Sequence, residues 1–66
     1  MSTIGEKLKS LRSGRGLTQD QVAQDLGISR SAINSYELDQ RVPRDEVKVR
    51  LANYYEKPIQ DIFFES

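Results

Sequence analysis

The sequence contains no cysteine and no histidine among its 66 residues. The chain therefore cannot form disulfides or bind a metal through thiolate or imidazole groups, and it lacks the base of the usual serine–histidine catalytic pair. We expect no metal, no cofactor and no enzymatic activity, because no nucleophile–base pair or cluster of metal ligands is present. The absence of cysteine also favours an intracellular protein over a secreted one.

Long apolar runs are also absent. The longest is Ile62-Phe63-Phe64, which is far too short to span a bilayer, and the first residues carry no apolar signal core. We therefore expect a cytoplasmic protein that makes no membrane contact. Residues 1–66 make one domain at most, which buries only about 60% of the surface that the unfolded chain exposes. Association with a second copy would add stability.

The chain has no net charge, because ten basic residues balance ten acidic residues. The charges are nevertheless separated along the sequence. Residues 1–16 contain four basic residues and one acidic residue, whereas residues 17–40 contain one arginine and four acidic residues. One face of the folded domain can therefore be basic although the sum is zero.

Apolar residues recur at helical spacing along the whole chain, and no segment alternates for long enough to predict a strand. The pattern predicts a first helix at about 3–13, with Ser2 or Thr3 as its N-cap. Pro43 is expected to open a fourth helix, and a short fifth helix is expected at about 58–64. The predicted fold class is all-α.

The second and third helices are predicted to be very close together in the sequence. Thr18 and Gln21 have the spacing of a capping box, and Gly27 can adopt the left-handed conformation that ends a helix. Ser29 is available as an N-cap two residues later. Two helices joined by a short turn containing glycine form a helix-turn-helix, here at about 18–37, whose second helix enters the major groove of DNA.

This arrangement resembles the Cro and phage-repressor type of helix-turn-helix, often called the XRE family. The resemblance covers nearly the whole chain and is carried by residues 4–12, 17–19, 33–37 and 61–64. It implies a compact five-helix, lambda-repressor-like DNA-binding domain in which the third helix is the recognition helix.

The resemblance also implies roles for individual residues. The residues at the start and on the outer face of the third helix would read bases, and they are Ser29, Arg30, Ser31, Asn34 and Ser35. The DNA backbone would be contacted by Thr18, Gln19, Arg41 and Arg44, and Gln19 would also brace the recognition helix. Arg12 and Glu37 would form a structural ion pair. The simpler alternatives are that the arginines are solvated and that the serines only occupy a helix surface.

The chemistry of two of these side chains supports base reading. An arginine in the first turn of a helix is mildly disfavoured by the helix dipole, so we expect Arg30 to have its partner outside the domain. Its guanidinium can bind O6 and N7 of guanine, and the amide of Asn34 can pair with N6 and N7 of adenine.

Two turns depart from the family pattern. Leu38-Asp39 stands where relatives have asparagine or a basic residue followed by glycine, and Glu56-Lys57 replaces glycine and valine before the last helix. Aspartate tolerates the left-handed conformation, so the first turn is expected to form. The negative charge of Asp39 makes contacts between this loop and the DNA backbone less favourable.

Apolar side chains are concentrated near the C-terminus. Ile59, Phe63 and Phe64 are the candidates for a contact between two identical chains. The alternative is that Ile62 and Phe63 only cap the core.

The sequence therefore predicts a sequence-specific transcriptional regulator that binds double-stranded DNA, expected to be a repressor. It would bind a palindromic operator as a homodimer, with half-sites ~34 Å apart, and no small-molecule ligand is evident. One alternative is a protein-interaction module, such as an antitoxin or adaptor. Another is the DNA-binding fragment of a longer repressor.

Overall fold

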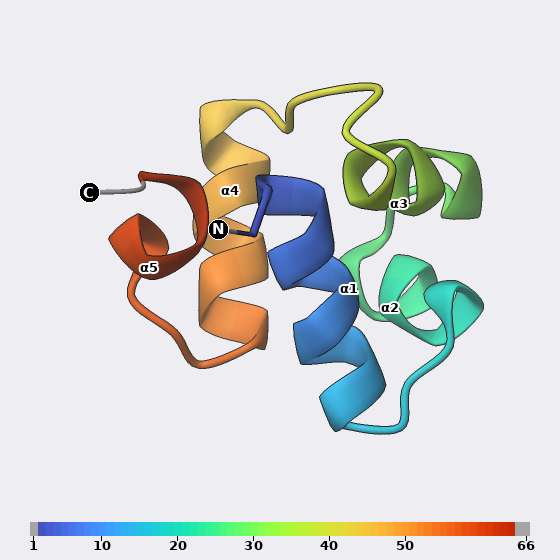
Figure 1. Ribbon diagram of the computed structural model, residues 1–66. Helices are drawn as coiled ribbons and strands as arrows, with labels where there is room; N and C mark the ends of the chain where they lie inside the picture. Colours follow the sequence, from blue (N-terminus) through green and yellow to red (C-terminus); the bar gives the residue numbers. More distant parts are fainter. Residues whose placement is uncertain (1, 65–66) are drawn as a thin grey trace.

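The computed structural model describes residues 2–64, and its regular secondary structure there is helical, as predicted. The elements are α1 (Ile4–Gly14), α2 (Gln19–Leu26), α3 (Arg30–Glu37), α4 (Asp45–Tyr54) and α5 (Ile59–Phe63). Helix α1 lies between the α2–α3 pair and the α4–α5 pair and contacts both α3 and α5 (Figure 1). Within residues 2–64, none of the helices has the length and apolar character needed to cross a membrane.

Helix α1 begins at a complete capping box. The hydroxyl of Thr3 accepts a hydrogen bond from the Glu6 backbone N–H at 3.1 Å, and the Glu6 carboxylate accepts one from the Thr3 N–H at 2.9 Å. These bonds satisfy two of the donors that a helix start leaves unpaired. Of the two N-caps considered from the sequence, Thr3 has this role.

The turn between α2 and α3 forms as its residues predict. Gly27 ends α2 with φ +67°, and the Ser29 hydroxyl accepts a hydrogen bond from the Ala32 N–H at 3.0 Å to begin α3. At the start of α2, Thr18 accepts from the Gln21 N–H at 3.1 Å. The Gln21 side chain instead donates to Asp25 at 2.9 Å, so the predicted capping box is only half formed.

Helix α4 begins two residues later than predicted. Pro43 is buried in the loop before the helix, and Arg44 is the N-cap, with ψ 161°. Asp45 and Glu46 follow in the first turn, where negative charge is favourable beside the positive end of the helix dipole. Helix α5 starts directly after Pro58, close to its predicted position.

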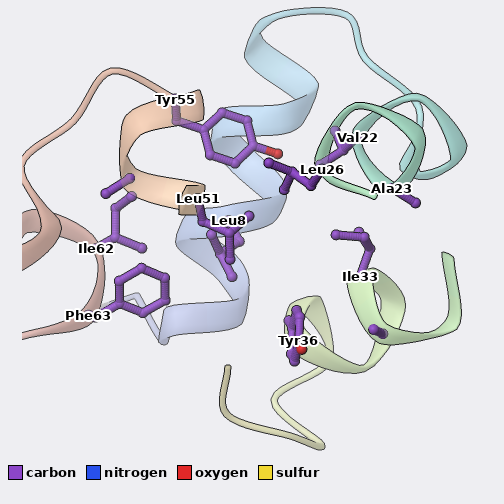
Figure 2. Close-up of a cluster of buried hydrophobic side chains, with 12 residues drawn as sticks. Leu8, Val22, Ala23, Leu26, Ile33, Tyr36, Leu51, Tyr55, Ile62 and Phe63 are labelled. Carbon is purple, nitrogen blue, oxygen red and sulfur yellow. The ribbon is translucent and has the colours of Figure 1, made fainter. Parts of the chain in front are cut away.

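Among residues 2–64, twelve buried apolar side chains form the core, and most of them are labelled in Figure 2. They are Leu8, Val22, Ala23, Leu26, Ala32, Ile33, Tyr36, Leu51, Ala52, Tyr55, Ile62 and Phe63. Phe63 is only 7% exposed and packs in the core, so little of its ring is available for the predicted contact between two chains. Phe64 is 56% exposed, and Ile59 is partly buried.

The backbone of α1 meets the end of α3 at Gly5. A Cβ at this position would lie 2.4 Å from the carbonyl oxygen of Glu37 and 2.8 Å from that of Tyr36. Real side chains never approach a backbone so closely, because the atoms would overlap. Gly5 therefore allows the two helices to come into direct contact.

Asp39 fixes the same junction from the other side. Its φ is +59°, the left-handed conformation expected for this turn. One carboxylate oxygen accepts from the Gly5 N–H at 2.8 Å, and the other accepts from the Thr3 hydroxyl at 2.6 Å. Asp39 thus caps the N-terminus of α1, where its negative charge is stabilised by the helix dipole.

Two arginines hold α4 against the rest of the domain. Arg15 donates to the carbonyl of Tyr55 at 2.8 Å, and Arg50 donates to the carbonyl of Leu26. Both carbonyls lie at helix C-termini, where backbone acceptors have no helical partner. Tyr54 adds a hydrogen bond to the Asp25 carboxylate at 2.7 Å, which also joins α4 to α2.

The buried phenol of Tyr55 gives the domain a stability limit at alkaline pH. Its side chain is 1% exposed, and burial, followed by the negative charge of Glu37, raises its pKa to about 12. The raised pKa stabilises the folded state fully below pH 10, and this contribution is lost as the pH rises toward 12. Between about pH 9 and about pH 11.5, the unfolding free energy of the native protein should fall by about 2 kcal/mol more than that of Tyr55→Phe.

Urea denaturation at the two pH values measures this difference. If the unfolding free energy fell equally in the native protein and in Tyr55→Phe, ionisation of the Tyr55 hydroxyl would not destabilise the folded state.

Candidate nucleic-acid interface

Helix α3 has one buried face and one exposed polar face. Ala32, Ile33 and Tyr36 pack into the core. Four of the five residues predicted to read bases are exposed, and they are Ser29, Arg30, Ser31 and Asn34. The fifth, Ser35, is partly buried, and its carbonyl accepts from the Gln40 N–H at 2.9 Å. The exposed side chains offer both donors and acceptors, which are the groups that can bind base edges.

Arg30 has a partner inside the domain, contrary to the expectation from the sequence. Its Nε lies 3.4 Å from a carboxylate oxygen of Asp20 in the first turn of α2. The Arg30 side chain is still 66% exposed and that of Asp20 is 78% exposed. An exposed pair of this kind contributes about 0–1 kcal/mol, so it restrains Arg30 without removing it from the surface.

Arg12 and Glu37 form the ion pair that the resemblance implied. Arg12 Nε lies 2.7 Å from one carboxylate oxygen and Nη2 lies 3.0 Å from the other. The side chains are 14% and 4% exposed, and the hydrogen bond to Glu37 is the main cause of a raised Arg12 pKa. The remaining guanidinium nitrogen, Nη1, donates to the Leu17 carbonyl at 2.8 Å. This pair therefore joins α1, the start of the helix-turn-helix and the end of α3.

Gln19 connects the Arg12–Glu37 pair to the exposed face of α3 through hydrogen bonds. Its Nε2 donates to Glu37 at 3.1 Å and to the Asn34 Oδ1 at 3.2 Å. A primary amide has two N–H donors, so both are used inside the domain. The side chain that was expected to contact a phosphate is left with only an acceptor, and a phosphate oxygen is an acceptor too. In this arrangement the donor that Gln19 has left for a phosphate is its backbone N–H.

Other donors remain available for the DNA backbone. Thr18 uses its hydroxyl oxygen as an acceptor at the start of α2, so its O–H can still be donated. The first N–H groups of α2 lie beside it, where a helix binds anions most readily. Arg41 and Arg44 are exposed on the loop before α4, and the Arg41 guanidinium lies 5.8 Å from the centre of the Tyr36 ring.

The acidic residues of the segment 17–40 are all partnered. Asp25 accepts from Tyr54 and Gln21, Glu37 pairs with Arg12, and Asp39 caps α1. Asp20 is paired with the exposed Arg30 at the start of α3. The negative charge seen in the sequence is therefore mostly used in holding helices together, which the sequence alone could not reveal.

The DNA-binding helix-turn-helix class is defined by two closely packed helices that are joined by a turn containing glycine. The second of these helices has an exposed polar face. The family model for the helix-turn-helix domain matches residues 5–63. The chain therefore belongs to the helix-turn-helix domain family, and membership implies DNA binding.

Several curated relatives agree with this assignment. The chain is 35% identical over 59 residues to the HTH-type transcriptional activator BcrR of Enterococcus faecalis, covering 89% of this chain. It is 32% identical over 63 residues to the cryptic phage CTXphi transcriptional repressor RstR of Vibrio cholerae, covering 96% of this chain. An uncharacterised HTH-type transcriptional regulator of Methanocaldococcus jannaschii is 35% identical over 57 residues, which make up 86% of each protein. All three are named as regulators and none as an enzyme.

The lengths of these relatives differ widely. The matched region makes up 29% of BcrR and 57% of RstR. The names include both an activator and a repressor, so the domain itself is compatible with either direction of regulation.

Proposed function

We propose that this chain is a transcriptional regulator that binds a specific sequence in double-stranded DNA and acts as a repressor in the cytoplasm. The observation that carries the proposal is the exposed polar face of α3, held in place by a buried network on its other side. A repressor is favoured because the match extends over 57% of RstR but over only 29% of the activator BcrR.

In this proposal, α3 enters the major groove and the base contacts come from Ser29, Arg30, Ser31 and Asn34. The partly buried Ser35 would lie at the edge of the contact. The DNA backbone would be bound by Thr18, by the first N–H groups of α2 and by the two exposed arginines Arg41 and Arg44.

We also propose that two copies bind a palindromic operator, with half-sites ~34 Å apart. Phe64 and Ile59 are the side chains left for a symmetric contact, since Phe63 belongs to the core. The Lys48 ammonium lies 5.3 Å from the centre of the Phe64 ring, which would keep this apolar side chain beside α4.

Selection from a random pool of duplex DNA at about 150 mM salt tests the proposal, because this salt level suppresses non-specific phosphate binding. Two inverted half-sites among the retained sequences would support the operator and the dimer together, and a single half-site would contradict the dimer. Retention without any motif would reject sequence-specific binding and favour a protein partner.

Replacing Arg30 with alanine should weaken binding to the selected sequence by about 1–3 kcal/mol and remove the preference at one base position. Arg44→Ala is the matched comparison, since it should weaken binding to all sequences alike and flatten the salt dependence by about one unit. Titrations of selected and scrambled duplexes at several salt concentrations measure both effects. If Arg30→Ala weakened binding to both duplexes equally, Arg30 would be a phosphate contact.

A further inference from the structure

The buried charge of Glu37 dictates the orientation of two amide groups. A carboxylate paired with arginine can only accept hydrogen bonds, so Gln19 must turn its NH2 group toward it. The second hydrogen of that NH2 group points to Asn34, which must therefore present its oxygen. Each step matches a donor with an acceptor, and reversing either amide would place two like groups in contact.

The consequence is that the Asn34 amide has a preferred orientation. Its Oδ1 is held 3.2 Å from Gln19 Nε2, while the Asn34 Nδ2 has no partner among residues 2–64. A paired contact with adenine requires Oδ1 and Nδ2 to face the same base edge together. An amide whose oxygen is held toward α2 meets a base with its NH2 group alone.

We propose that Asn34 reads DNA as a hydrogen-bond donor only, and that Gln19 is the positioning residue that makes it so. The base at this position is then one that offers an acceptor in the major groove, namely O6 or N7 of guanine, O4 of thymine or N7 of adenine. Cytosine on the contacted strand is disfavoured because its edge carries the N4 amino donor, so the Asn34 NH2 group would have to reach across to the paired guanine. This inference rests on the proposed function and replaces the paired adenine contact expected from the sequence.

The test compares the motifs selected from random duplex DNA by the native protein and by Asn34→Ala. The position whose preference disappears in the variant is the one that Asn34 reads, and we expect guanine or thymine there. Replacing that base by cytosine should weaken binding of the native protein about threefold to tenfold.

If the position is adenine, duplexes containing purine, which lacks the N6 amino group, decide the result. Unchanged binding supports a contact to N7 alone, whereas weaker binding shows the paired contact and overturns the proposal. A motif that is the same in both proteins would also overturn it, because Asn34 would not read a base. The absence of any motif in the native protein would instead reject the proposed function itself.

A second variant tests the positioning role. Gln19→Ala should release the Asn34 amide, which can then make the paired contact, so the preference for adenine at the Asn34 position should rise relative to guanine and thymine while the other positions keep their preferences. Gln24→Ala is the control, because Gln24 is an exposed glutamine of the same helix. If Gln19→Ala weakens binding to every sequence and leaves the Asn34 position unchanged, Gln19 serves only the fold or the DNA backbone.

Discussion

Replacing Gly5 with alanine is expected to lower the free energy of unfolding by about 3 kcal/mol, a large part of the total stability of a domain this small. The added Cβ would lie 2.4 Å from the Glu37 carbonyl oxygen and 2.8 Å from that of Tyr36. These neighbours are backbone atoms at the end of a helix, so they cannot move aside as a flexible side chain would. Helix α1 would have to separate from α3.

Urea denaturation of Gly5→Ala and Gly14→Ala provides the measurement and its control. Gly14 also lies in α1, but a Cβ there would meet no atom within 4 Å. Alanine is a better helix former than glycine, so Gly14→Ala should raise stability by about 0.5–1 kcal/mol. If Gly5→Ala were as stable as the native protein, the close approach of α1 and α3 would be incorrect.

Replacing Glu37 with glutamine should cost about 3 kcal/mol, since breaking a buried ion pair leaves one charge without its partner. Arg12 would keep a guanidinium that is only 14% exposed, with its bond to the Leu17 carbonyl but without the carboxylate. The amide of the variant can replace only part of these contacts, because it offers one acceptor oxygen in place of two.

Asp20→Asn is the matched comparison for this second prediction. It removes the carboxylate of the exposed pair with Arg30, and a loss below about 1 kcal/mol is expected in the same denaturation experiment. If Glu37→Gln and Asp20→Asn lost similar amounts of unfolding free energy, burial would not increase the contribution of the Arg12–Glu37 pair to stability.

The helices and the central turn could be predicted from the sequence because their signals are local. Thr3, Gly27 and Ser29 act within a few residues of their own positions, and each has its predicted role in the structure. The start of α4 was misplaced at Pro43, since a proline fits both the first turn of a helix and the segment before it.

Contacts between distant residues could not be predicted in the same way. Asp39 was interpreted as a turn residue and an unfavourable charge, but it caps α1 through residues 34 and 36 positions away. Its role depends on the path of the chain, which no local pattern describes. Gly5 did carry a signal, because a glycine inside the first turn of an amphipathic helix indicates a close approach.

The candidate site was predictable as a set of positions, but the chemistry of each position was not. Arg30 was expected to lack an internal partner and has Asp20. Gln19 was expected to bind phosphate and to brace the recognition helix, and it contacts α3 through both amide hydrogens, at Asn34 and Glu37. In both cases the deciding partner comes from the other helix of the motif, so the relative placement of α2 and α3 had to be known.

The link from Arg12 through Glu37 and Gln19 to Asn34 has a consequence for protein engineering. A recognition surface transplanted to another scaffold by copying the outer residues of α3 would transfer Arg30 and Ser31 but would lose the orientation of Asn34. That orientation depends on four positions spread over three helices, so these positions have to be transferred together. During divergence of the protein, the same four positions are expected to change as a group.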